Sequence, residues 1–149
     1  MGHIRSQACV RVAWASALAG LLVLTGCGSD PSDVEKIGEC GGIHFPDSAK
    51  VIATKSAMAG GGDQTVEVVA ELPRADLDSF QANSHLDQFQ AGVPSNWKSQ
   101  YWQGSGVADS LQADAGNEHY TEWDGKTGRQ VVVHDLGGDK SMVFARGLC

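Results

Sequence analysis

Residues 118–148 read EHYTEWDGKTGRQVVVHDLGGDKSMVFARGL, and this stretch decides the fold. It holds three runs of strand-forming residues, at 118–123, 129–135 and 140–148. DGKTG joins the first two runs, and a connection containing GGD joins the last two. Short glycine-containing connections between such runs are typical of β-hairpins. The stretch therefore predicts a three-strand antiparallel meander.

A second hairpin is expected nearer the N-terminus. Residues 51–58 (VIATKSAM) and 65–72 (TVEVVAEL) flank the turn sequence GGGD at 60–63. Alternation of apolar and polar side chains along an antiparallel strand predicts one buried face and one wet face. In the second run this alternation sets Val66, Val68, Ala70 and Leu72 against Thr65, Glu67 and Glu71.

The chain between the two hairpins favours helix. Residues 74–82 (RADLDSFQA) carry Leu77 and Phe80 three positions apart, the spacing of one helix face. Residues 84–87 (SHLD) resemble a capping box, which predicts a further short turn of helix. We therefore expect one helix, or two short ones, in this segment.

The order of these elements predicts the fold class. Strands, then helix, then strands indicate a small single α+β domain, an antiparallel ββαβββ sheet with a helix on one face. A small β-sandwich is the alternative. Residues 95–102 (SNWKSQYW) fit either a helical turn or a loop, and residues 104–116 read as irregular chain.

The first 26 residues are typical of an export signal. Arg5 and Arg11 precede the uncharged run VAWASALAGLLVL at 12–24. This run is shorter than the roughly 20 residues with which a helix crosses a bilayer, so a signal peptide is preferred to an uncleaved anchor, the alternative.

The run ends in Leu24-Thr25-Gly26-Cys27, which resembles the lipobox of bacterial lipoproteins. The resemblance covers about the first 30 residues. It implies cleavage after Gly26, a diacylglycerol on the Cys27 sulfur and an N-acyl chain, such as palmitate, on the new amine. More than one acyl chain makes membrane binding stable. It also implies a place on the outer face of the cell membrane. An outer-membrane place is possible in a double-membraned bacterium, because Gly28 and not Asp follows the cysteine.

These features divide the chain into three parts. Residues 1–26 are the expected lipoprotein signal peptide, and residues 40–149 the α+β domain. Residues 27–39 are polar and acidic after Cys27, which predicts a flexible lipidated tether.

Cysteine usage predicts a disulfide. Cys9 leaves with the signal and Cys27 carries lipid, so Cys40 and Cys149 are the thiols left in an oxidising, exported compartment. We expect them to pair, with two free thiols or an intermolecular bridge as the alternatives. The pair would tie the C-terminus to the start of the domain.

Two short stretches of the body, HFPDSA at 44–49 and LPRADL at 72–77, loosely resemble small lipoproteins of actinobacteria that have no assigned activity. The resemblance implies no activity for this chain.

Charge and motifs argue against several functions. After removal of Arg5 and Arg11, nine basic residues stand against 18 acidic ones, which disfavours nucleic acid. Gly125-Lys126-Thr127 lacks the earlier glycine of a phosphate loop, and Ser105 lacks the glycine spacing of a nucleophile elbow. The mature histidines form no metal-ligand motif, so no metal is expected; they are His44, His85, His119 and His134. With none of these motifs present, no catalytic residue and no non-lipid cofactor is expected either.

An aromatic cluster supplies the candidate binding residues. If the segment is helical, Trp97 and Tyr101 stack four positions apart on one face, with Trp102 beside them. If exposed, they would form a platform for a sugar ring or a partner protein; if buried, they would supply core to a chain with few aliphatic residues.

The sequence therefore predicts a non-enzymatic lipoprotein of the cell envelope. Its expected role is to bind an envelope protein or a cell-wall glycan. The alternatives are a small inhibitor lipoprotein or, less well supported, a small hydrolase or metal-binding enzyme.

Overall fold

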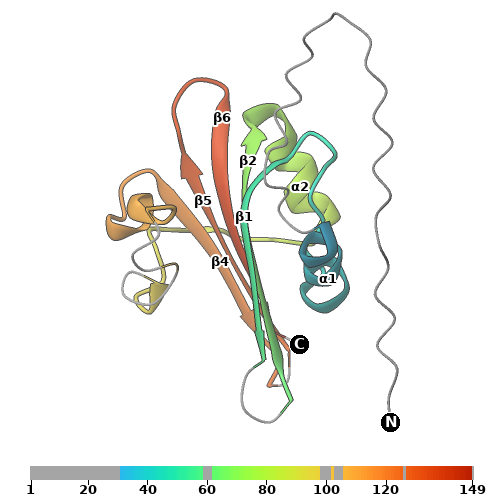
Figure 1. The fold of residues 1–149 in the computed structure, drawn as a ribbon. Coiled ribbons are helices and arrows are strands. Elements are labelled where there is room, and N and C mark those ends of the chain that lie inside the picture. The colour runs from blue at the N-terminus through green and yellow to red at the C-terminus, as the bar shows by residue number, and fades with distance from the viewer. Residues whose placement is uncertain (1–30, 59–61, 98–101, 103–105, 126, 149) are drawn as a thin grey trace, which may run out of the picture.

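The computed structural model describes residues 31–58, 62–97, 102, 106–125 and 127–148 (Figure 1). Its helices are α1 (Pro31–Gly41) and α2 (Leu77–Asn83), with 3-10 turns at Arg74–Asp76 and Asp109–Gln112. Its strands form one six-stranded sheet in the order β1-β2-β6-β5-β4-β3. Their bounds are β1 Lys50–Met58, β2 Gln64–Pro73, β3 Gln90–Ala91, β4 Asn117–Trp123, β5 Gly128–Asp135 and β6 Lys140–Leu148. Within these ranges, no helix is both long and apolar enough to span a membrane.

Both expected hairpins are present, and every strand pair is antiparallel. β4, β5 and β6 form the meander, and β1 pairs with β2. The two units join through β2 and β6, from Thr65 opposite Leu148 to Pro73 opposite Lys140. The prediction of a small domain with an antiparallel sheet and helix is confirmed. The described strands lie in a single sheet, so the β-sandwich alternative is wrong.

One face of the sheet is covered by the two helices (Figure 1). Ile37 of α1 and Phe80 of α2 are fully buried there, and the Phe80 ring lies 5.3 Å from the ring of Phe45. The sheet contributes the expected alternating side chains of β2 together with residues of β5 and β6: Val66, Val68, Ala70, Leu72, Val131, Val133, Val143 and Ala145.

Helix α1 corrects the prediction of a flexible tether over residues 27–39. The segment from Pro31 is helical, and its apolar side chains Val34 and Ile37 pack against the core. Its last turn approaches β6 so closely that a Cβ at Gly41 would lie 3.3 Å from the Gly147 Cα. Two apolar side chains one turn apart are enough to dock a short helix on a sheet, although the segment as a whole is polar.

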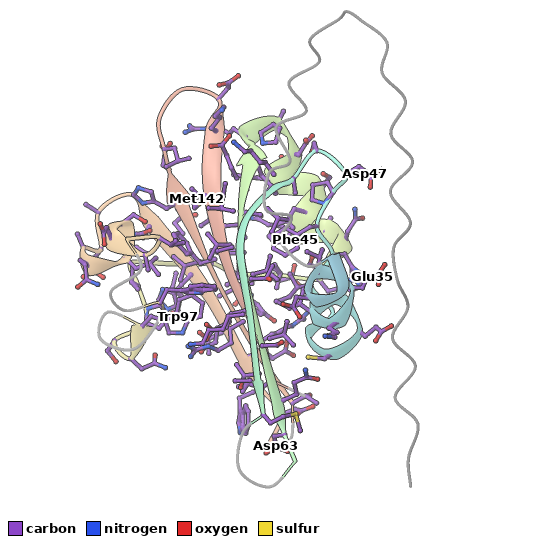
Figure 2. All side chains as sticks on the ribbon, viewed as in Figure 1. Glu35, Phe45, Asp47, Asp63, Trp97 and Met142 are labelled. Atoms are coloured by element: carbon purple, nitrogen blue, oxygen red, sulfur yellow. The ribbon has the colours of Figure 1, made fainter. Side chains whose placement is uncertain are left out.

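The second face is partly covered, which corrects the prediction of one wet face on β2. Residues from the segment between β3 and β4 pack over it, on the side opposite the helices (Figure 1). Figure 2 shows Trp97 on this side and Phe45 on the helical side. Glu67, on the same face, is also buried. The second core consists of Val69, Val93, Trp97, Ala108, Leu111, Val132 and Phe144.

The helical turn expected at residues 84–87 is also absent. α2 ends at Asn83, and His85 adopts a φ of 50° in a turn. The Ser84 hydroxyl, expected as a cap, instead accepts the His44 backbone N–H at 2.9 Å.

Candidate ligand-binding site

Of the three predicted aromatic residues, Trp97 belongs to the core. Its side chain is fully buried, and its indole Nε1 donates to Gln130 Oε1 at 2.9 Å. The Arg146 guanidinium carbon lies 5.2 Å from its ring centroid. The exposed-platform alternative is therefore wrong for Trp97, and the core alternative is confirmed.

Trp102 and Tyr101, the other two predicted residues, differ from Trp97. Trp102 is half-buried against the same core, with Lys55 Nζ 6.0 Å from its ring centroid. Tyr101 lies outside the described residues, so its predicted role stays a prediction.

Among the described residues, the one exposed tryptophan is Trp123, at the end of β4, and the sequence pattern did not single it out. It is 61% exposed. Its ring lies against the backbone of Gly128 on β5, where an added Cβ would collide with the ring carbon Cε3 and lie 2.9 Å from Cζ3. The same Cβ would lie 3.3 Å from Leu148 Cδ1, so the indole reaches across β5 toward β6. Glycine at 128 makes room for this ring.

The register of the strands places Trp123 on the same face as Trp97. Two rows of residues cross the sheet next to the second core, nearer the turn between β4 and β5, and we call them the open half-face; Trp97 partly covers the second row. One row is Trp123, Gly128, Leu148, Thr65 and Ala57, and the next is Thr121, Gln130, Arg146, Glu67 and Lys55.

A cavity of about 250 Å³ opens in this half-face. We call it the Glu67 cavity, lined by Lys55, Ala57, Thr65, Glu67 and Arg146. Its volume is below the roughly 300–1,000 Å³ of sites that enclose a whole drug-sized ligand, so it fits part of a larger ligand.

Glu67 is the unusual group in this cavity. Its residue is only 5% exposed, yet it pairs with Arg146 through one oxygen alone. Arg146 Nε and Nη2 both reach Oε1, at 2.8 and 2.7 Å. Within the described part of the chain, the other oxygen, Oε2, is buried and has no hydrogen-bond partner. Such an acceptor costs about 1–3 kcal/mol when unsatisfied, so the site lacks one donor.

A larger cavity, of about 520 Å³, lies on the helical side near the start of β4. Four of its polar side chains are engaged with each other or with the backbone. Arg74 pairs with Asp135, Asp114 Oδ1 accepts the Val93 N–H at 3.0 Å, and the Asn117 amide donates to two carbonyl groups. These bonds make it a weaker candidate than the Glu67 cavity.

Two of the histidine rings make hydrogen bonds within the domain. His119 Nδ1 lies 3.0 Å from the Gly92 carbonyl oxygen, and His134 Nδ1 lies 3.1 Å from Asn117 Oδ1. Among the described residues, no three His, Cys, Asp or Glu side chains are grouped so that they could hold a metal ion.

The cysteines are described in part. Cys40 is disulfide-bonded, while its expected partner Cys149 and the expected lipidation site Cys27 lie outside the described residues. A Cβ at Gly147, two residues before Cys149, would lie 3.3 Å from Cys40 Sγ. The end of β6 therefore runs beside Cys40, which favours the expected pairing.

The chain was also compared with known proteins. No family model matches it, nor does any curated protein or solved structure.

Proposed function

We propose that this chain is a lipoprotein of the cell envelope, anchored by lipid on Cys27, whose domain binds a cell-wall ligand without catalysis. The lipobox-like sequence and the preceding apolar run support the anchor. The proposed binding domain is the expected ββαβββ unit with two additions, α1 before it and the two-residue strand β3 between α2 and β4. The observation that carries the proposal is the open cavity lined by Glu67, whose Oε2 is buried and has no hydrogen-bond partner among the described residues.

The short link between lipid and domain supports a role close to the membrane. Helix α1 begins at Pro31, four residues after Cys27. Four residues span at most about 14 Å, so the lipid would hold the domain against the bilayer surface. The proposed site lies on the sheet face that α1 does not cover.

Lipidation is tested by growing cells with labelled palmitate. The native chain should incorporate the label and fractionate with membranes. Cys27→Ser should lose the label and accumulate as the uncleaved precursor, while Cys9→Ser should behave as native. Equal labelling of native and Cys27→Ser chains would contradict the anchor.

Ligand binding is tested with the detergent-extracted lipoprotein and washed, insoluble cell-wall material. We expect co-sedimentation that Glu67→Gln weakens and Glu71→Gln does not. Glu71 is a matched control because it lies on the same strand and face but pairs with Lys140 at 2.7 Å. Absence of co-sedimentation, or equal loss in both variants, would contradict a cell-wall ligand at this cavity.

A further inference from the structure

We propose that the open half-face binds a neutral saccharide of two or more rings, with hydroxyl groups in the Glu67 cavity and one ring stacked on Trp123. The inference rests on the proposed binding function and names its ligand class. The structure places a buried acceptor and an exposed indole on one face of the same sheet.

The Glu67 cavity offers hydrogen-bonding groups of both kinds to a ligand. Among the described residues, Glu67 Oε2 has no hydrogen-bond donor, since Arg146 Nε and Nη2 both bond to Oε1. Because this oxygen is buried, a ligand in the cavity can supply the donor only with a small shift of the Glu67 side chain. Thr65 and Lys55 add a hydroxyl and an ammonium at the rim of the cavity. A ligand that carries donors and acceptors close together, as vicinal sugar hydroxyls do, can satisfy such a set at once.

The charges that line the cavity limit the kind of ligand it can hold. An anionic ligand would bring its charge to the unpaired oxygen of Glu67, and a cationic ligand would meet Lys55 and Arg146. An apolar ligand would cover Oε2 without providing a donor, which is unfavourable. A neutral, hydroxyl-rich ligand avoids all three costs.

Trp123 supplies an aromatic surface beside the cavity. The face of an indole carries the negative side of its quadrupole and attracts the polarised C–H groups on the flat face of a sugar ring. Trp123 offers this surface because it is 61% exposed and rests on Gly128. Leu148, the neighbour of Gly128 in the row, extends the apolar floor toward Thr65.

The spacing of the strands sets the size of the ligand. The Trp123 ring lies over β5, and Glu67 is on β2, with β6 between them. Two strand spacings correspond to about 10 Å, so one ring cannot touch both groups. Two or more linked rings are needed.

The test uses the full lipoprotein, extracted in a detergent without a sugar head group and with its disulfide intact. The probes are tri-N-acetylchitotriose, maltotriose and mannotriose, measured by calorimetry and tryptophan fluorescence. We expect at least one to bind and to shift the fluorescence. Glu67→Gln should weaken binding about tenfold or more. Trp123→Ala should abolish the fluorescence shift and also weaken binding.

Controls separate binding from folding. Leu136→Ala and Glu71→Gln change an exposed apolar residue and a paired carboxylate away from the cavity, and both should bind as native. Each variant is melted to confirm its fold. If Glu67→Gln fails to fold, Trp123→Ala carries the test alone, because its side chain is exposed.

Two outcomes would overturn the saccharide proposal. One is no response at about 10 mM of every trisaccharide, ten times a 1 mM Kd. The other is native affinity in Trp123→Ala. If the protein still co-sediments with cell walls in a Glu67-dependent way, only the saccharide class is wrong. If it does not, the proposed binding function fails as well.

Discussion

At the scale of single residues, Arg129 on β5 joins parts of the chain that are far apart in sequence. Its guanidinium donates to the carbonyl oxygens of Ser84 at 2.6 Å and His85 at 3.0 Å, and its Nε to Glu122 Oε2 at 2.7 Å. A further, longer bond reaches the Gly41 carbonyl at 3.4 Å. The Arg129 side chain is only 17% exposed. If it is truncated, water can therefore satisfy few of the acceptors that it now bonds.

We predict that Arg129→Ala lowers the free energy of unfolding by about 3 kcal/mol, because several carbonyl groups lose a charged donor. Arg129→Lys should recover only part of this, since an ammonium cannot span the same acceptors. Urea unfolding measures both. The control Arg74→Ala removes an ion pair whose side chains are about half exposed, and it should cost less than about 1 kcal/mol. Equal losses at 129 and 74 would contradict this role.

Tyr120 gives a prediction at alkaline pH. Burial, and the hydrogen bond of its hydroxyl to Glu122 Oε2 at 2.8 Å, raise the pKa of Tyr120 above its ordinary value of 10. A raised pKa means that the folded state holds the proton more tightly than the unfolded state. The stabilisation is therefore full below pH 10 and is lost as pH rises through the folded pKa.

Phenolate absorbance of the native protein should show this late titration, with urea-unfolded protein as the reference. Tyr120→Phe should remove it, and Glu122→Ala should move it to lower pH. An unchanged alkaline titration in Tyr120→Phe would contradict the assignment.

The burial of some side chains could be predicted from the sequence, and that of others could not. The buried side of β2 was predictable because Val66 and Val68 alternate with polar neighbours. The burial of Glu67 was not, because a glutamate on a strand is expected at the surface and its partner Arg146 lies far away in the sequence. The exposure of Trp123 was equally hidden, because its ring position depends on Gly128 across the hairpin.

At the scale of elements, strands and turns were more predictable than helices. The glycine turns and the run VVV at 131–133 define the meander locally, and the structure confirms it. Helix α1 was missed because its sequence, PSDVEKIGECG, is mostly polar and has two glycines. Its stability comes from docking on the sheet rather than from helix propensity.

The docking of α1 on the sheet should contribute to the stability of the domain. Ile37 is fully buried between α1 and the sheet, so Ile37→Ala should lower the free energy of unfolding by about 2–5 kcal/mol. Glu39→Ala on the exposed side of the same helix should change it by no more than about 0.5 kcal/mol. Denaturant unfolding distinguishes the two. A neutral Ile37→Ala would mean that α1 is a tether after all.

At the scale of the whole molecule, the sheet has one face packed under two helices and one face half open. The helical face buries its core under α1 and α2, while the other face leaves the open half-face beside its own core. This division separates the part of the molecule that provides most of its packing from the part proposed to bind. Substitutions at Trp123 should therefore affect ligand binding more than folding.

The disulfide acts at the same scale, because it would close a loop of almost the whole domain. Cys40 lies at the end of α1, and the end of β6 runs beside it. If Cys149 is the partner, the loop holds about a hundred residues, and the chain-entropy model gives up to about 4.7 kcal/mol of stabilisation. We predict that Cys149→Ser lowers the melting temperature to the same extent as adding reductant to the native protein.

Reductant should have no further effect on Cys149→Ser, because the proposed bond is already absent. Mass spectrometry of the unreduced protein should show a peptide containing residue 40 linked to one containing residue 149. Because the bond constrains the unfolded chain, its loss should change the midpoint of unfolding more than the ligand affinity of the folded state. A Cys149→Ser variant that still loses stability in reductant would assign Cys40 a different partner.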